Sequence, residues 1–175
     1  LNADMIFNFP SQTSEMLARD LEFLVDLGID QITYYPLMVS DSTRRIVSRT
    51  LGEVDYRKEK AFYRQIVACL RNRYRSSSAW CFSRKSGMID EYVVNYDEYA
   101  GLGSGSIGFL SGTCYANTFD IRDYIDQVTG DRDGFPLMAS RDFSPHDRLR
   151  YDFLMKLFGM TMDMDEMNVK YGGRA

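Results

Sequence analysis

The sequence has very little histidine and cysteine. His146 is the single histidine, follows the helix-starting Pro145, and is predicted to be an ordinary first-turn residue rather than part of a Ser-His-Asp or Cys-His catalytic arrangement. The three cysteines, Cys69, Cys81 and Cys114, lie 12 and 33 residues apart, a spacing that fits neither a disulfide framework nor a close-spaced metal motif. We therefore predict reduced, buried thiols.

Long apolar runs and an excess of positive charge are also lacking. No run approaches the ~18 apolar residues of a membrane span, and no basic start followed by an apolar segment indicates a signal peptide. The net charge of −4 predicts no general attraction to nucleic acid or to anionic membranes. These absences predict a cytoplasmic protein without a membrane span and without a nucleic-acid partner.

The 175 residues, 45% of them hydrophobic, are enough for one sizeable core, or for one core with a small appendage. The chain opens with LNADMIFNFP and has no initiator methionine. We therefore expect it to be a piece of a longer protein, whose preceding part would hold the chemistry.

The N-terminal residues predict a βαβ unit. Residues 3–9 form an apolar run that is typical of a strand buried on both faces. A helix is expected over 14–27, capped by Thr13 and ended by Gly28, and residues 31–36 predict a second strand. Strand, helix and strand within ~30 residues predict parallel neighbouring strands with a right-handed crossover.

The rest of the chain predicts mixed secondary structure. The expected elements are a loop with a short helical piece at 39–55, helices at 55–74, 120–130 and from 144 onward, and strands at 78–85, 91–95 and 113–118. In the last helix, the apolar side chains of Leu149, Phe153, Leu154 and Leu157 are expected to face inward.

The stretch GLGSGSIGFLSG at 101–112 contains Gly103, Gly105 and Gly108 at the G-x-G-x-x-G spacing of dinucleotide-binding turns. That fingerprint requires a helix to begin at the glycines, whereas the residues that follow are strand-like, so the dinucleotide interpretation is rejected. Because the stretch also contains Ile107 and other apolar residues, it does not suit a solvated linker. A packed turn remains, in which glycines bring the backbone close to another strand or to a ligand.

Three segments taken together resemble one family. Residues 3–13 (ADMIFNFPSQT), 27–38 (LGIDQITYYPLM) and 99–117 (YAGLGSGSIGFLSGTCYAN) are similar, in order and spacing, to the rear half of oxygen-independent coproporphyrinogen III oxidases, which are radical S-adenosylmethionine (SAM) enzymes. The resemblance implies an α/β fold. Residues 1–118 would form the rear βαβ part of an open radical SAM (β/α) barrel, and residues 119–175 a mixed, mostly helical C-terminal domain.

The resemblance also implies two cofactors, SAM and a 4Fe-4S iron-sulfur cluster. The cluster would be bound by a CxxxCxxC motif in an N-terminal half that precedes this chain, because the motif is absent here. This chain by itself is therefore expected to be inactive, and its missing N-terminal half is its first expected partner.

Individual SAM-contacting positions follow from the same resemblance. Asp4 stands where a family carboxylate reaches SAM, although a loop-capping role is the alternative. Met38 stands at an apolar contact position that is usually alanine, and its bulk argues against a second SAM molecule. Ile107 would pack against the adenine side, with Gly103 and Gly105 giving close backbone approach. No catalytic residue and no metal ligand is expected in this chain.

Basic residues are candidates for substrate binding, since the guanidinium group suits carboxylates. Arg84, after the aromatic strand, and Arg44 and Arg45, in the loop after the second strand, would meet substrate propionates. A solvated surface is the alternative for all three. The Met-rich stretch at 159–168 would border a flat apolar ligand or serve as core filler.

For the longer protein, the family implies oxidative decarboxylation of two propionates to vinyls in haem biosynthesis, with a tetrapyrrole as substrate. Two alternatives stay open within the same resemblance. One is a haem-binding chaperone, which would use the same pocket without decarboxylation. The other is a radical SAM methyltransferase of anaerobic haem degradation.

Overall fold

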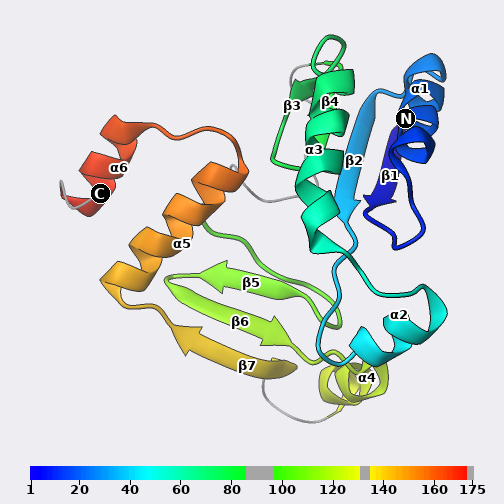
Figure 1. Ribbon diagram of the computed structural model, residues 1–175. Coiled ribbons are helices and arrows are strands. Elements are labelled where there is room, and N and C mark those ends of the chain that lie inside the picture. Colours follow the sequence, from blue (N-terminus) through cyan, green and yellow to red (C-terminus); the bar gives the residue numbers. More distant parts are fainter. Residues whose placement is uncertain (86–96, 131–134, 173–175) are drawn as a thin grey trace. The chain divides into compact units, whose positions relative to one another are not determined.

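The computed structural model describes residues 1–85, 97–130 and 135–172 (Figure 1). The chain forms two compact units, Leu1–Glu91 and Tyr92–Ala175, which are considered separately below. The strand expected at 91–95 lies outside the described residues. Of the helices that the structure describes, none has the length and apolar character that crossing a membrane requires.

The N-terminal unit is a four-stranded sheet with helices. Its elements are β1 (Asn2–Phe7), α1 (Ser14–Asp26), β2 (Gln31–Pro36), α2 (Arg44–Thr50), α3 (Tyr56–Leu70), β3 (Arg75–Ser76) and β4 (Cys81–Ser83). The strand order is β1-β2-β4-β3, so β1 is an edge strand. As predicted, β1 and β2 are parallel neighbours joined through α1, whereas β4 runs antiparallel to both β2 and β3.

Local sequence signals fix the helix ends. The Thr13 hydroxyl accepts a hydrogen bond from the Met16 backbone N–H, and Gly28 ends the turn after α1 with φ +68°. At the start of α3, the Asp55 carboxylate accepts from the Arg57 N–H. These caps confirm the predicted starts of both helices and the glycine stop.

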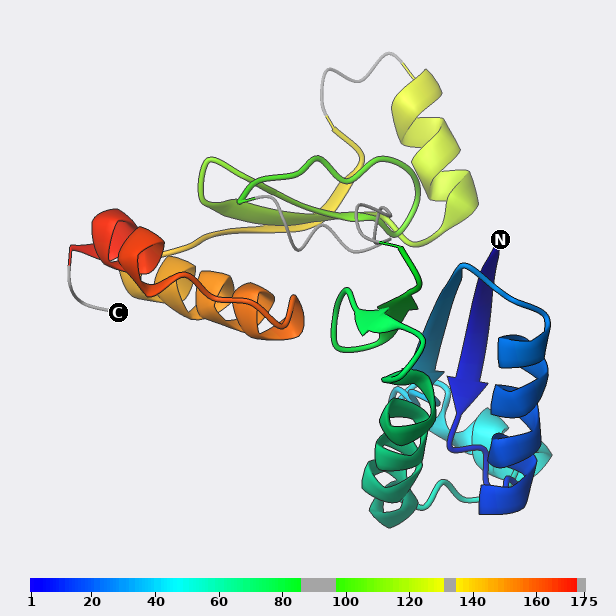
Figure 2. The same cartoon turned by 90° about the horizontal axis from the view of Figure 1, so that it is seen from above.

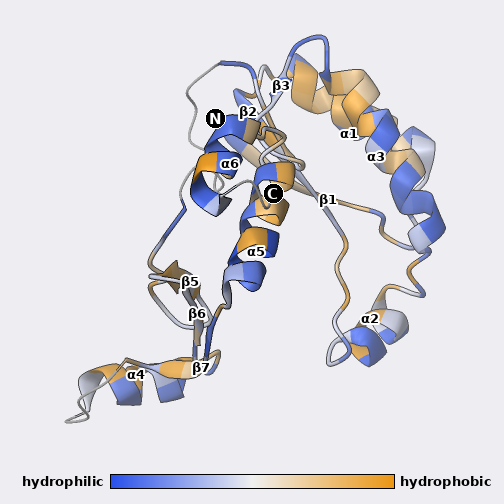
Figure 3. Cartoon of the chain, turned by 90° about the vertical axis from the view of Figure 1, so that its left-hand side faces the viewer, coloured by the Kyte–Doolittle hydropathy of each residue, from blue (hydrophilic) through white to orange (hydrophobic). Residues whose placement is uncertain are grey.

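The core of this unit lies on one face of the sheet. Helices α1 and α3 lie on the same side of β1 and β2 (Figures 2 and 3). Leucines of α1 and apolar residues of α3 pack against alternate residues of β1, β2 and β4. The buried cluster is Phe7, Leu17, Leu21, Leu24, Ile29, Ile32, Tyr34, Phe62, Ile66, Leu70, Tyr74 and Phe82.

The other face of the sheet is polar along β1. Asn2, Asp4 and Ile6 are exposed, while the alternate residues Ala3 and Met5 pack against the core. The expectation that this strand is buried on both faces is therefore wrong. Helices cover one face only, so every second residue of β1 is free to be polar.

The C-terminal unit contains a three-stranded antiparallel sheet and three helices. Its elements are β5 (Ile107–Leu110), β6 (Thr113–Asn117), α4 (Ile121–Thr129), β7 (Leu137–Asp142), α5 (Pro145–Phe158) and α6 (Met164–Tyr171). The sheet order is β5-β6-β7. The 101–112 stretch thus contains strand β5 and the turn to β6, which confirms that a strand rather than a helix follows its first glycines.

The division between the units differs from the one expected at residue 118. Strand β7 pairs with β6 along the register from Thr113↔Asp142 to Asn117↔Leu137, so residues on both sides of position 118 belong to one sheet. Sequence periodicity missed β7 because all six of its residues are exposed and the strand carries no alternating apolar pattern.

Helix α5 begins as predicted, with the Ser144 hydroxyl accepting from the Asp147 N–H. Its expected inner side is wrong, because Phe153, Leu154 and Leu157 are exposed. The side of α5 that packs instead carries Tyr151, whose ring lies 4.7 Å from that of Phe109, and the buried Asp152.

Helix α1 offers a direct test of the one-sided core. Leu17→Ala is expected to lower the free energy of unfolding of the N-terminal unit by about 2–5 kcal/mol, because Leu17 is fully buried. Met16→Ala, at a half-exposed neighbour on the same helix, is the matched control and should cost less than about 1 kcal/mol. Urea unfolding followed by circular dichroism measures both, and equal losses would contradict the packing.

Candidate functional site

The connection after β2 carries three of the predicted site residues. Met38 lies two residues beyond the strand and is 66% exposed. Arg44 begins α2, pairs with Asp41 at 2.9 Å, and lines a cavity of about 200 Å³ between α2 and the start of α3. The adjacent Arg45 is exposed as well. The structure thus brings Met38, Arg44 and Arg45 to the carboxyl side of β2, where α/β folds place their ligands.

Asp4 lies within β1, on the polar face of the sheet, directly opposite Thr33 of β2. Its carboxylate is exposed and accepts from the Asn2 side-chain amide at 3.3 Å. The neighbouring Thr33 hydroxyl is buried and has no hydrogen-bond partner among the described residues. Of these two polar groups, only the exposed Asp4 carboxylate can be reached by a ligand.

Arg84 is not brought together with Arg44 and Arg45. Because β4 is antiparallel to β2, the residue after β4 lies at the amino end of β2, whereas the other two arginines follow its carboxyl end. The Arg84 guanidinium donates to the Gly28 carbonyl oxygen at 3.0 Å, and its backbone N–H donates to Asp30 O at 2.9 Å. These contacts tie Arg84 to the turn before β2, which is a structural role.

Asn117 holds the glycine turn of the C-terminal unit. It ends β6, is 4% exposed, and its side-chain amide donates to Gly101 O at 3.3 Å, to Gly103 O at 3.1 Å and to Ser106 Oγ at 2.9 Å. The Gly105 N–H donates to Thr118 O at 2.8 Å, which closes the turn onto the end of β6. The turn is therefore a rigid, hydrogen-bonded cap on this end of the sheet.

Two tyrosine hydroxyls complete the turn. Tyr115 accepts from the Gly101 N–H at 2.9 Å, and Tyr124 of α4 accepts from the Gly103 N–H at 3.2 Å. Sequence reasoning missed Asn117 and both tyrosines as supports of the turn. A strand-ending Asn and two ordinary aromatic positions carry no local signal that they bond to a turn earlier in the chain.

The glycines of the turn have different reasons to lack a side chain. A Cβ at Gly108 would overlap the Tyr115 ring, and one at Gly105, whose φ is +71°, would lie 2.9 Å from the Phe119 ring. Gly103 has φ +97°, but a Cβ there would meet nothing within 4 Å. Packing thus explains Gly105 and Gly108, while the backbone of Gly103 borders open space.

Ile107 projects from the sheet at the same end. It pairs with Ala116, which in turn pairs with Ala139, and its side chain is 52% exposed. Beside it lies a mainly apolar hollow of about 250 Å³, lined also by Cys114 and Phe143. Small residues on the neighbouring strands leave this space, which suits the flat face of an aromatic ring.

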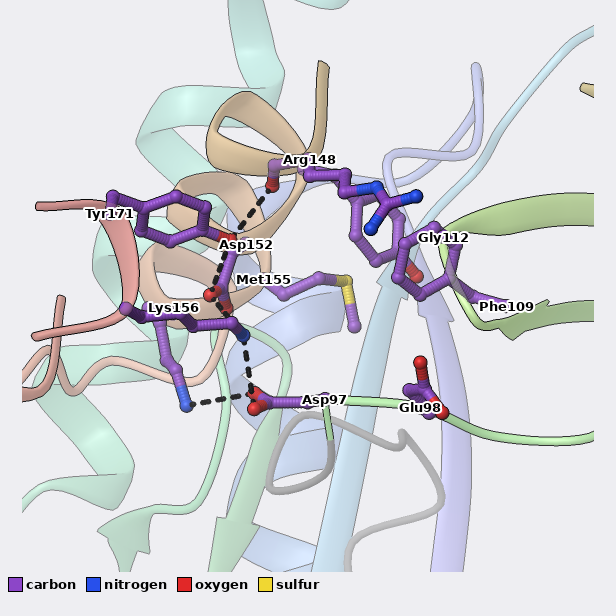
Figure 4. A pocket seen from close by; sticks show the side chains of 11 residues that line it. Asp97, Glu98, Phe109, Gly112, Arg148, Asp152, Met155, Lys156 and Tyr171 are labelled. Carbon is purple, nitrogen blue, oxygen red and sulfur yellow. Dashed lines mark hydrogen bonds and ion pairs between the residues drawn. The ribbon is translucent and has the colours of Figure 1, made fainter. Parts of the chain in front are cut away.

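An ionic cavity of about 80 Å³ lies elsewhere in this unit, between α5, α6 and residues 97–98 (Figure 4). Lys170 Nζ lies 2.7 Å from the buried Asp152 carboxylate and 3.0 Å from Asp97. Burial lowers the pKa of Lys170, but hydrogen bonds to these two carboxylates outweigh it and the net shift is upward. The Tyr171 hydroxyl also donates to Asp152, at 3.0 Å. The charges are mutually paired, so they fasten α6 to α5.

The residues present do not fit an iron-sulfur cluster. Cys69 is exposed, Cys81 is buried and Cys114 is half-buried. In the part of the chain that the structure describes, no group of three His, Cys, Asp or Glu side chains is placed to hold a metal ion. The prediction of three buried thiols holds for Cys81, is wrong for Cys69 and holds only in part for the half-buried Cys114.

Comparison with known proteins gives three relatives, while no protein-family model matches the chain. The heme chaperone HemW of Lactococcus lactis is 28% identical over 135 residues, which are 71% of this chain and 35% of that protein. HemW of Bacillus subtilis is 21% identical over 167 residues, 90% of this chain and 42% of that protein. The solved structure of the radical SAM enzyme coproporphyrinogen III oxidase (HemN) from Escherichia coli matches with a TM-score of 0.73 at 17% identity, covering 98% of this chain and 43% of that one.

The Asn117 network gives a testable prediction. Asn117→Ala is expected to cost about 1–3 kcal/mol of unfolding free energy and to speed hydrogen exchange at the Gly105 amide, because three acceptors of the turn lose their donor. Thr118→Ala is the control, since among the described contacts Thr118 serves the turn through its backbone only. Unchanged exchange at Gly105 in Asn117→Ala would show that the turn is held by other contacts.

The structural match confirms the predicted α/β fold class. The chain spans about two fifths of the length of the proteins it matches. In sequence the chain is similar to HemW heme chaperones, and in fold it is similar to part of the coproporphyrinogen III oxidase HemN.

Proposed function

We propose that this chain is part of a haem-binding radical SAM protein, in which it forms walls of the SAM and tetrapyrrole sites. The observation that supports the proposal is the open space beside the glycine turn. A Cβ at Gly103 would meet nothing within 4 Å, and Ile107 lies at the same end of the sheet beside an apolar hollow of about 250 Å³.

The expected SAM contacts are chemically suited to that ligand. The half-exposed side chain of Ile107 would pack against the adenine ring, and the open space beside the Gly103 Cα would allow close approach, although the N–H and C=O groups of Gly103 are already hydrogen-bonded within the turn. Asp4 would accept hydrogen bonds from a polar part of SAM, with the unsatisfied Thr33 hydroxyl beside it. When bound, SAM would supply a radical only together with a cluster held outside this chain.

Arg44 and Arg45 would meet the propionates of a tetrapyrrole. Both are exposed on the carboxyl side of β2, and guanidinium groups pair with carboxylates in a planar, bidentate geometry. Arg84 lies at the opposite end of β2, where its guanidinium donates to the Gly28 carbonyl oxygen, so it is not part of this proposal. The large, exposed Met38 supports binding of one SAM molecule rather than two.

Haem is proposed as the tetrapyrrole because both sequence relatives are named heme chaperones. The oxidase contributes a match in fold at 17% identity, which says less about the ligand. We therefore favour a haem chaperone over an enzyme that carries out the oxidative decarboxylation first implied by the resemblance. Methylation of haem remains a second reaction that would start from the same ligand.

The test uses the product of the complete reading frame that contains this chain, purified without oxygen. We expect ferric haem to bind at a one-to-one ratio, measured as a saturable change in the Soret absorption band, and coproporphyrinogen III to stay unchanged with SAM and a reductant. Mass spectrometry of the bound haem separates a chaperone, which returns haem intact, from a methyltransferase. Conversion of coproporphyrinogen III without haem binding would overturn the proposal in favour of the oxidase.

The SAM contact has its own test in the same protein. Ile107→Asp is expected to weaken SAM binding at least about tenfold, because a carboxylate would be buried against the adenine ring, while the iron content stays unchanged. Leu110→Asp, the same change at the other end of β5, is the matched control, since Leu110 is also partly exposed. If equilibrium dialysis gives the same SAM affinity for wild type and Ile107→Asp, Ile107 does not contact SAM and the glycine turn serves packing alone.

A further inference from the structure

Helix α5 presents a chemically unusual face. His146, Leu149, Arg150 and Phe153 follow one another at intervals of three, one and three residues, which places them along one side of the helix. His146 and Arg150 are exposed. Neither the imidazole nor the guanidinium forms a hydrogen bond or an ion pair with any residue that the structure describes. The two polar groups are therefore available to a ligand.

Two hollows border this face and share Leu149. One, of about 470 Å³, is lined by His146 and by the C-terminal end of α6. The other, of about 250 Å³, is lined by apolar side chains and by the stem of Arg150, the apolar residues being Leu149, Phe153, Met162, Met164 and Met167. Together they make one surface that is apolar at its Met end and polar at its His146 end.

The surroundings explain why these groups remain free. The neighbouring cations are occupied, since Lys170 is paired with Asp97 and Asp152, and Arg141 is paired with Asp147 at 3.2 Å. Arg150 is thus the cation of this surface that has no carboxylate partner among the described residues. A ligand that fits must be broadly apolar, must carry a carboxylate for Arg150, and must use an imidazole.

Iron tetrapyrroles combine those three properties. Histidine is a common axial ligand of haem iron, methionine side chains adapt to the flat apolar ring, and arginine pairs with a propionate. Helical spacing separates His146 and Arg150 by one turn, about 6 Å of helix rise, so an iron at His146 and a propionate at the ring edge can be contacted from the same helix.

We propose that the α5–α6 surface is a haem site, with His146 as the iron ligand and Arg150 as the partner of a propionate. The Met-rich residues 162–167 cover the apolar part of the ring. This inference rests on the proposed haem binding and assigns it to the C-terminal unit, where Arg150 takes the propionate-binding role given above to Arg44 and Arg45. It gives a role to the single histidine and to the Met-rich stretch.

The test titrates ferric haem into the product of the complete reading frame and into its His146→Ala variant. We expect His146→Ala to bind at least about tenfold more weakly and to shift the Soret band, and added free imidazole to restore the wild-type spectrum. Restoration by imidazole would not occur if His146 were only a structural residue. Iron-free protoporphyrin should bind wild type and variant alike.

A charge variant tests the propionate contact independently. Arg150→Gln is expected to weaken haem binding about three- to tenfold without moving the Soret band, because it leaves the iron ligand in place. Arg122→Gln, at an exposed arginine of α4, is the matched control and should leave haem affinity unchanged. Circular dichroism checks that each variant is folded.

The outcomes separate the two proposals. If wild type binds haem and His146→Ala has the same affinity and spectrum, the α5–α6 site is wrong while haem binding by the protein stands. If wild type binds no haem, both the proposed function and this site are wrong.

Discussion

The one-sided core of the N-terminal unit is the constraint on which its chemistry depends. Helices α1 and α3 cover one face of the sheet and pack against alternate residues of β1 and β2, including Phe7 and Tyr34. The residues between them need not be apolar, so a carboxylate at Asp4 costs little stability. A second helical layer would have required apolar residues there. The same packing that stabilises the unit therefore leaves the outer face of β1 polar.

In the C-terminal unit, the main structural constraint is that a glycine-rich segment must be held in one conformation. Glycine loses more conformational freedom on ordering than other residues, so a turn with several glycines needs many contacts. The two N–H groups of the buried Asn117 amide are shared among three acceptors of the turn, and two tyrosine hydroxyls accept from the turn's own amides. Side chains of the following strand and helix therefore order the turn, while the space that a Cβ at Gly103 would enter stays open.

Much of the fold was predictable from sequence because its signals are local. Thr13, Gly28 and Asp55 mark helix ends through contacts within a few residues, and the leucine spacing of α1 identifies its buried side. Strand β7 was not predictable, since its exposed residues show no alternation and its pairing with β6 depends on residues far away in sequence. For the site, the resemblance predicts Gly103 and Ile107 as SAM contacts, and this stays a prediction. The resemblance could not show that Arg84 lies at the opposite end of β2 from Arg44, because that depends on β4 running antiparallel.

The position of β1 at the edge of its sheet has a consequence for how the chain behaves in solution. Its outer backbone N–H and C=O groups have no strand partner among the described residues, and an open edge of six residues is a template on which a further strand can pair. Asp4 is the single charged side chain on that strand. Unless another strand pairs with β1, two copies of the chain can associate by pairing the backbones of their β1 strands.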